Sequence, residues 1–153
     1  MEYTSEQISY MKRALELAEK ARGFTEPNPL VGAVIVKNGE VIAKAHNLTE
    51  EKNSPLAHAE LLALTKALQN ENVKYLSDCT LYVTLEPCPM CMGAILHSRV
   101  ERIVFGAYDE KTGCSGSKAD FSEFSFFRKP QILGGYMEKE CREMLTEFFR
   151  ELR

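Results

Sequence analysis

Two short segments place three metal-binding side chains and one further acid where two helices are expected to begin. They are His58-Ala59-Glu60 and Pro87-Cys88-Pro89-Met90-Cys91. The spacing of the two cysteines lets both sulfurs bind one metal, and a helix N-terminus favours the thiolate form that binding requires. One imidazole and two thiolates leave the fourth tetrahedral position of zinc for water, as in catalytic zinc sites. The pattern predicts one Zn²⁺ per chain, bound by His58, Cys88 and Cys91.

Each half of this pattern has an ordinary alternative when it is taken alone. A lone Cys-x-x-Cys also occurs in redox pairs and structural zinc knuckles, and a lone His-x-Glu is common by chance. A redox pair gives no reason for the histidine and the glutamate, and a closed zinc site needs a fourth Cys or His nearby. His97 is expected about 9 Å from Cys91 along the same helix, which is too far to close the site. The conjunction of the two segments therefore favours a catalytic zinc.

Glu60 is not needed as a ligand, which leaves its carboxylate available for proton transfer. Zinc lowers the pKa of bound water from 15.7 to about 7 and so provides hydroxide at neutral pH. A neighbouring carboxylate can take a proton from that water and return it to a substrate nitrogen and to departing ammonia. The sequence thus predicts hydrolytic deamination, with Glu60 as the catalytic acid and base.

The hydrophobic pattern along the chain predicts an α/β fold. Apolar residues recur at helical spacing in four segments, and Asn38-Gly39 between two apolar runs is a strong signal for a two-residue β-hairpin. The expected helices begin at residues 5, 58, 90 and 138, and the expected strands are 31–36, 41–43, 80–85, 102–106 and 131–133. This order implies a mixed sheet with helices on both faces.

Size and composition are those of an ordinary globular domain. The chain of 153 residues fits one domain, so we expect residues 1–153 to fold as a single unit. No segment approaches the roughly 20 apolar residues of a membrane span, and residues 1–12 lack the apolar core of a secretory signal. Five cysteines without such a signal argue against a disulfide framework, so we expect a cytoplasmic protein. A net charge of -3 offers no general attraction to nucleic acid.

The chain resembles the cytidine and deoxycytidylate deaminase superfamily over nearly its whole length. Within it, the chain is most similar to the bacterial tRNA adenosine deaminases, which convert the wobble adenosine to inosine. The zinc motif, with the stretches VGAVIVKNGEVIAKAHN and HAELLAL, marks the superfamily, whereas the tRNA branch is suggested by LYVTLEPCPMCMGAILHSRVERIVFGA, KTGCSGS and ECREMLTEFFRELR. The resemblance implies a three-layer α/β/α cytidine deaminase-like fold with a mixed five-stranded sheet. The whole chain would then be a single zinc-dependent deaminase domain.

The resemblance also implies how a base is held and how the chains assemble. Asn47 and the backbone around Ala59 would contact the base, and a homodimer partner would help to shape the substrate groove. Taken alone, Asn47 is better explained as a turn or capping residue. Asn28 lies in Pro27-Asn28-Pro29, a segment that is similar to the deaminase domain of riboflavin biosynthesis, where it helps to hold a pyrimidine nucleotide.

Two segments depart from the usual pattern of the tRNA branch. One is the segment that contains Pro27-Asn28-Pro29, and the other lies before the last expected strand. There the chain has Phe126-Phe127-Arg128 where the tRNA enzymes usually carry Asn-His-Arg. The phenylalanines between residues 121 and 127 are able to stack on bases, but for most of them packing against the terminal helix is the favoured interpretation. Candidate phosphate contacts are Arg128, Lys129, Arg150 and Arg153.

Three functional hypotheses follow from the sequence. In the first, the chain deaminates the wobble adenosine of a tRNA anticodon loop, with the target base splayed out into the pocket. In the second, the same site acts on a free nucleobase, nucleoside or nucleotide, such as guanine, cytosine or a pyrimidine intermediate, in keeping with the net acidity and the two departures. In the third, the chain is a noncatalytic zinc-stabilised binding module. Such a module would not need an acid, Glu60, positioned beside the metal.

Overall fold

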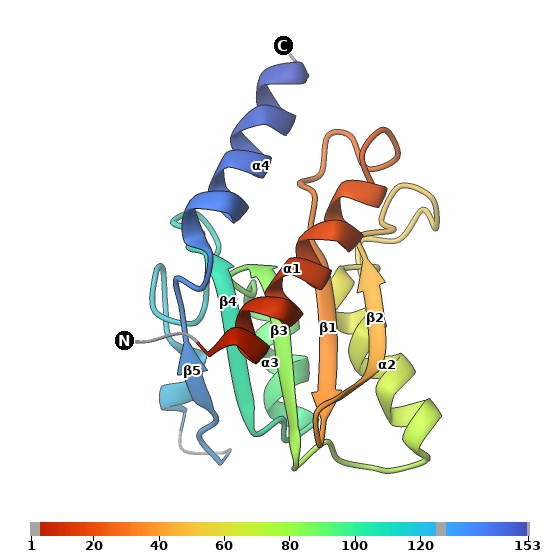
Figure 1. Cartoon of the computed structure of the whole chain (residues 1–153), viewed down its shortest axis with the longest axis vertical. Helices are drawn as coiled ribbons and strands as arrows, with labels where there is room; N and C mark the ends of the chain where they lie inside the picture. The colour runs from red at the N-terminus through yellow and green to blue at the C-terminus, as the bar shows by residue number, and fades with distance from the viewer. Residues whose placement is uncertain (1–3, 125–127, 153) are drawn as a thin grey trace.

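The computed structural model describes residues 4–124 and 128–152 (Figure 1). The helices are α1 (Ser5–Lys20), α2 (Ala59–Glu71), α3 (Pro89–His97) and α4 (Glu138–Glu151), with a short 3-10 helix η1 (Phe121–Glu123). The strands are β1 (Gly32–Lys37), β2 (Glu40–His46), β3 (Cys79–Leu85), β4 (Arg102–Ala107) and β5 (Gln131–Leu133). The predicted elements are confirmed in kind and order. None of the helices in this described part has the length and apolarity that crossing a membrane requires.

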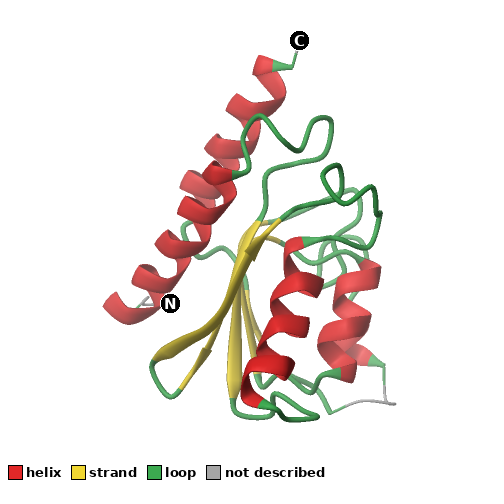
Figure 2. Cartoon of the chain, turned by 90° about the vertical axis from the view of Figure 1, so that its right-hand side faces the viewer, coloured by secondary structure: helices red, strands yellow, loops and turns green. Residues whose placement is uncertain are grey.

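The five strands form one mixed sheet in the order β2-β1-β3-β4-β5. Strand β1 pairs antiparallel with β2 and β3, whereas β3, β4 and β5 are parallel to one another. Helices cover both faces of this sheet, as Figure 2 shows. The three-layer α/β/α architecture expected from the sequence is therefore confirmed.

The β1–β2 hairpin has the two-residue turn that Asn38-Gly39 predicts. Lys37 pairs with Glu40 directly across it, and the backbone φ angles of Asn38 and Gly39 are 50° and 78°. Both turn residues thus lie in the left-handed region, which asparagine and glycine tolerate better than other residues.

Side chains of the central strands alternate between two apolar layers. Leu81 and Ile103 belong to the core beneath α2 and α3, whereas their neighbours Tyr82 and Val104 belong to the core beneath α1 and α4. All four are buried, because a central strand covered on both faces has no solvent side. Packing on both faces holds β3 and β4 in place, and the site is built at the ends of these two strands.

Helices α1 and α4 lie together on one face of the sheet. Thr4 and Gln7 form a capping box at the start of α1, and Arg22 just beyond α1 pairs with Glu151 of α4 at 2.7 Å. Figure 1 shows α4 running past the upper end of the sheet, the end at which α2 and α3 begin. The end of α4 therefore projects beyond the edge of the sheet at which the site lies.

The expectation that the phenylalanines between residues 121 and 127 pack against the terminal helix is wrong for Phe121. Its side chain packs into the core on the α2–α3 face, and its ring stacks on Phe124 with centroids 5.1 Å apart. The cause is η1, which is capped by the Asp120 carboxylate and lies against α3, on the opposite side of the sheet from α4. Phe126 and Phe127 lie outside the described residues.

Candidate active site

Helices α2 and α3 each begin at a predicted zinc ligand. His58 is the N-cap of α2, Cys88 is the N-cap of α3, and Cys91 is the third residue of α3. Neither N-cap side chain makes a capping hydrogen bond, although Ser, Thr, Asp or Asn at such positions commonly contributes about 1 kcal/mol. Both helix starts therefore direct their ligands to a common point instead of capping themselves.

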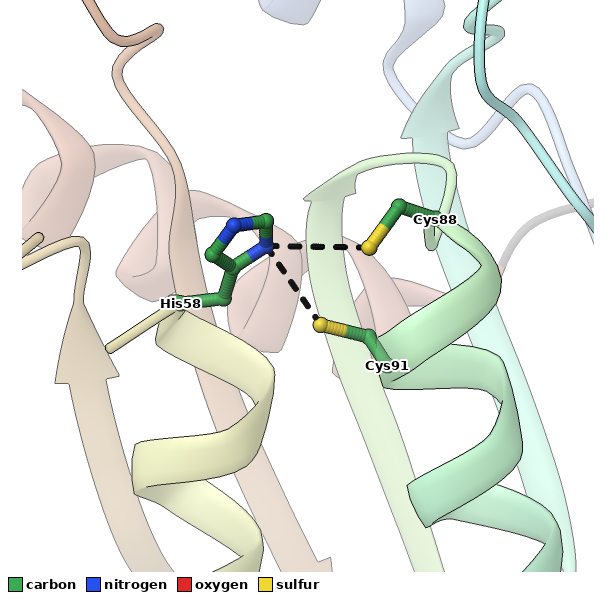
Figure 3. Close-up of side chains that lie close together, drawn as sticks. All are labelled: His58, Cys88 and Cys91. Carbon is green, nitrogen blue, oxygen red and sulfur yellow. Dashed lines mark hydrogen bonds between the residues drawn. The ribbon is translucent and has the colours of Figure 1, made fainter. Parts of the chain in front are cut away.

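The three ligand atoms have the spacing that zinc requires. His58 Nδ1 lies 3.7 Å from Cys88 Sγ and 3.5 Å from Cys91 Sγ (Figure 3). Zinc bonds of about 2.0 Å to nitrogen and about 2.3 Å to sulfur at tetrahedral angles imply about 3.5 Å between the two atoms. Within residues 4–124 and 128–152, this is the group of His, Cys, Asp and Glu side chains close enough to hold a metal ion. The donor set and its geometry both fit zinc.

The two cysteines interact strongly with one another. A hydrogen bond from Cys91, aided by His58, lowers the pKa of the Cys88 thiol to about 4, against the effect of burial. The pKa of Cys91 is raised in turn, because Cys88 holds its proton and because its side chain is buried. One thiolate is thus already favoured, and a cation bound between the sulfurs favours the second.

Glu60 lies beside this group without belonging to it. It is the second residue of α2, is only 4% exposed, and is absent from the cluster of metal-binding atoms. Burial raises the pKa of its carboxyl to about 7, despite opposing hydrogen bonds and the nearby His58. A carboxyl with a pKa close to neutral is suited both to accept and to release a proton.

A pocket of about 190 Å³ opens beside the ligands. It is lined by Asn28, Pro29, Val31, Asn47, His58, Ala59, Glu60, Leu85, Glu86, Cys88, Asp109 and Thr112. The predicted zinc ligands, catalytic residue and base contacts therefore all line this pocket except Cys91, which lies 3.5 Å from His58 in the metal cluster. Its small volume suits one heterocyclic base, because pockets for drug-sized ligands begin at about 300 Å³.

Asn47 has the turn role that its residue type predicts. Its Oδ1 accepts from the Thr49 N–H at 2.8 Å, and its Nδ2 donates to the Pro29 carbonyl at 3.2 Å. A carboxamide oxygen accepts two hydrogen bonds and its nitrogen donates two, so each atom retains capacity for one more. Asn28, which precedes Pro29 in the pocket lining, donates from its Nδ2 to Glu50 Oε1 at 2.8 Å.

Glu86 is a pocket residue that sequence reasoning missed. It follows β3, two residues before Cys88, and is 2% exposed. Its carboxylate accepts hydrogen bonds from residues 109–117. The sequence does offer one signal for this residue, which is an acidic side chain placed directly between an apolar strand and Pro87. Acidic residues are almost never fully buried unless they are paired, so an acid at a position expected to be buried predicts hydrogen-bond partners.

Comparison with known proteins places this geometry in a defined class. Residues 4–107 match the family model of the cytidine and deoxycytidylate deaminase zinc-binding region. A tRNA-specific adenosine deaminase of Bacillus subtilis is 49% identical over 145 residues, which cover 94% of this chain and 89% of the relative. A structure from studies of A-to-I editing by tRNA:A34 deaminases superposes with a TM-score of 0.82 at 37% identity, over 90% of this chain and 99% of the other. The guanine deaminase structure from Bacillus subtilis gives a TM-score of 0.62 at 40% identity, over 69% and 66%.

The fold and the metal-binding triad together define a zinc-dependent hydrolytic deaminase. The chain belongs to the cytidine and deoxycytidylate deaminase family, whose zinc-binding region spans both ligand segments. Zinc as the cofactor, predicted from the spacing of His58, Cys88 and Cys91, is thereby confirmed.

Proposed function

We propose that this deaminase converts the wobble adenosine of a tRNA anticodon loop to inosine, and that residues 1–153 form one catalytic domain. The observation that carries the proposal is similarity over nearly full length, at 49% identity, to a relative named for this activity. The pocket beside the zinc ligands adds support, because its volume of about 190 Å³ suits one splayed base.

The proposed reaction replaces the exocyclic amine of adenine by oxygen. His58, Cys88 and Cys91 hold the zinc, which when bound supplies hydroxide at neutral pH. Glu60 accepts one proton from the attacking water and gives it to the ring nitrogen, and then takes the second proton from the new C6 hydroxyl and gives it to the leaving amine. A C–O bond forms at C6, the C–N bond breaks, and ammonia departs. No oxidant or reductant is required.

Base recognition is assigned to groups at the pocket wall. Asn47 retains one donor and one acceptor, which match the adjacent acceptor and donor of a heterocycle. Ala59 is the first residue of α2, and the first N–H groups of a helix have no partner within it. Asn28 also lines the pocket. These three residues are the proposed substrate contacts.

Contacts outside the pocket distinguish an RNA substrate from a free base. Arg128, Lys129 and Arg150 are exposed, and Lys129 pairs with Glu123 at 2.6 Å. Arg150 lies in the last turn of α4, which runs past the site end of the sheet (Figure 1). Arg153, the fourth candidate phosphate contact, lies outside the described residues, as does most of the Phe126-Phe127-Arg128 departure. Homodimer formation and cytoplasmic location remain predictions from the sequence.

Deamination of a free base such as guanine is the second candidate. It is favoured by the 40% identity and shared fold of the guanine deaminase structure. Ammonia release from a panel of an anticodon stem-loop with wobble adenosine, free adenosine, guanine and cytosine separates the candidates. We expect the stem-loop to be deaminated and the free compounds to react poorly.

Salt dependence and a matched pair of variants test the RNA contacts. Binding of the stem-loop should weaken steeply as salt rises, because phosphate contacts release counterions. Arg150→Gln should weaken stem-loop binding without loss of zinc. Arg142→Gln is the control, because Arg142 is on the same helix but is paired with Glu138 at 3.0 Å. A salt-independent reaction with guanine, unaffected by Arg150→Gln, would support the second candidate.

A further inference from the structure

One buried carboxylate outside the proton-transfer machinery binds a segment that contributes two residues, Asp109 and Thr112, to the pocket lining. Glu86 Oε1 accepts from the Asp109 N–H at 3.0 Å and from the Ser117 hydroxyl. Its Oε2 accepts from the Ser115 N–H at 2.9 Å and from the Ser117 N–H at 3.0 Å. All four donors belong to the segment of residues 109–117, which we term the wall loop. A buried carboxylate with this many donors is well satisfied, whereas one without them would be strongly unfavourable.

The wall loop is shaped to enclose this carboxylate. A Cβ added to Gly113 would lie 2.4 Å from Glu86 Cδ and 2.4 Å from the Asp109 carbonyl oxygen, so only glycine fits there. The Cys114 N–H donates to the Pro87 carbonyl at 2.8 Å, which binds the loop to the residue that precedes Cys88. The close fit of the backbone at Gly113 and the hydrogen bonds of the carboxylate therefore both hold the wall loop against Glu86.

The other end of the wall loop faces the pocket. Asp109 and Thr112 line it together with His58 and Glu60. The Asp109 carboxylate accepts from the Thr112 N–H at 3.2 Å and from the Thr112 hydroxyl at 2.9 Å, which makes these two residues one rigid turn. The backbone N–H of the same Asp109 is held by Glu86. The position of the turn at the pocket is thus coupled to the buried carboxylate.

We propose that Glu86 is a positioning residue that sets the shape of the substrate pocket through the wall loop. It acts through Asp109 and Thr112, without taking part in proton transfer or metal binding. The proposal deepens the proposed function and rests on it for the identity of the substrate. The structural part, control of the wall loop by one carboxylate, is measurable without any substrate.

Glu86→Gln is the sharpest perturbation, because it preserves size but replaces one acceptor oxygen by a donor. If its NH₂ group takes the place of Oε2, this donor faces the N–H groups of both Ser115 and Ser117, and neither hydrogen bond can form. If the NH₂ group takes the place of Oε1, it faces the Asp109 N–H, and that hydrogen bond is lost. The Ser117 hydroxyl can rotate and accept a hydrogen bond from the NH₂ group. At least one backbone N–H of the wall loop loses its partner in either orientation, which favours local opening of the loop.

The experiment compares zinc-loaded wild type with Glu86→Gln by amide hydrogen exchange, zinc analysis and steady-state kinetics. We expect exchange in residues 109–117 to accelerate by about 10-fold or more, with one zinc per chain retained. KM for the wobble-adenosine stem-loop should rise by about 10-fold, with a smaller change in kcat. Glu123→Gln is the control for the exchange measurement, because that carboxylate is exposed and pairs with Lys129 instead of with the wall loop.

A second variant keeps the proposal testable if Glu86→Gln does not fold. Ser117→Ala removes one donor to Glu86 and leaves the three backbone N–H groups, so a smaller acceleration within the wall loop is expected. Unchanged exchange in the wall loop would overturn the proposal, as would acceleration spread equally over α1 and α4. Local acceleration without a rise in KM would also overturn it. If wild type ignores the stem-loop, the proposed function fails separately, and the kinetic comparison is made with guanine.

Discussion

Replacing Glu60 by glutamine should separate chemistry, metal binding and stability. The amide keeps the shape of the side chain but cannot accept and return a proton, so turnover should fall by about 10² to 10⁴ or more. Zinc content should stay near wild type, because Glu60 is not among the metal-binding atoms. Parallel measurements of ammonia release and of zinc per chain on the same preparation check both statements.

The same substitution should stabilise the metal-free protein at neutral pH. Burial raises the Glu60 pKa from 4.5 to about 7, and each pKa unit corresponds to 1.36 kcal/mol. The folded state therefore holds the proton more tightly than the unfolded state, so stability falls as pH rises from 4.5 to about 7. A neutral glutamine does not titrate. Glu60→Gln should gain on the order of 3 kcal/mol above pH 7, and the gain should vanish below pH 4.5.

Urea unfolding of chelator-treated wild type and variant at pH 4 and pH 8 measures this difference. The gain should be smaller in the zinc-loaded protein, because a nearby cation favours the carboxylate. Glu123→Gln, at an exposed carboxylate, should show no comparable gain. Loss of zinc from Glu60→Gln would show that Glu60 is a ligand, and equal stabilisation at both pH values would refute the effect of burial.

Three further outcomes test the zinc cluster, the buried thiols and the α1–α4 layer. Cys88→Ala should lose both zinc and activity, and retention of one zinc per chain by metal analysis would contradict the assigned ligand set. Burial raises the pKa of Cys141 to about 12 and that of Cys79 to about 11, so the free energy of unfolding, measured in urea under reducing conditions, should fall as pH rises above 9.0; a flat profile would contradict this. Phe148→Ala, at a side chain that is 1% exposed, should lower the free energy of unfolding by about 3–5 kcal/mol with zinc retained, and a loss below about 1 kcal/mol would show that α4 is not packed as described.

The elements were predictable wherever their signals are local. Asn38-Gly39 specifies the hairpin through backbone conformations that only a few residue types tolerate. The metal ligands were equally predictable, because His58, Cys88 and Cys91 have side chains that bind zinc and spacings that allow it. Local chemistry of this kind needs no knowledge of the rest of the fold.

Long-range features escaped the sequence for physical reasons. The partners of Glu86 are mostly backbone N–H groups 23 to 31 residues further along the chain, and a backbone group carries no residue identity. The expectation that most of the phenylalanines between residues 121 and 127 pack against the terminal helix does not hold for Phe121, because apolar character predicts burial but not the side of the sheet on which η1 lies. Asn47 combines a turn role with a place at the pocket, and residue type alone predicted only the former.

Position-resolved detection of inosine in an anticodon stem-loop tests the central claim most directly. The RNA carries adenosine at the wobble position and at one other loop position, and is incubated with zinc-loaded wild type or with Glu60→Gln. We predict that wild type forms inosine at the wobble position alone, and that the variant, with its zinc retained, forms none at comparable enzyme concentration. Absence of inosine from the RNA, together with ammonia release by wild type from guanine, would contradict the account.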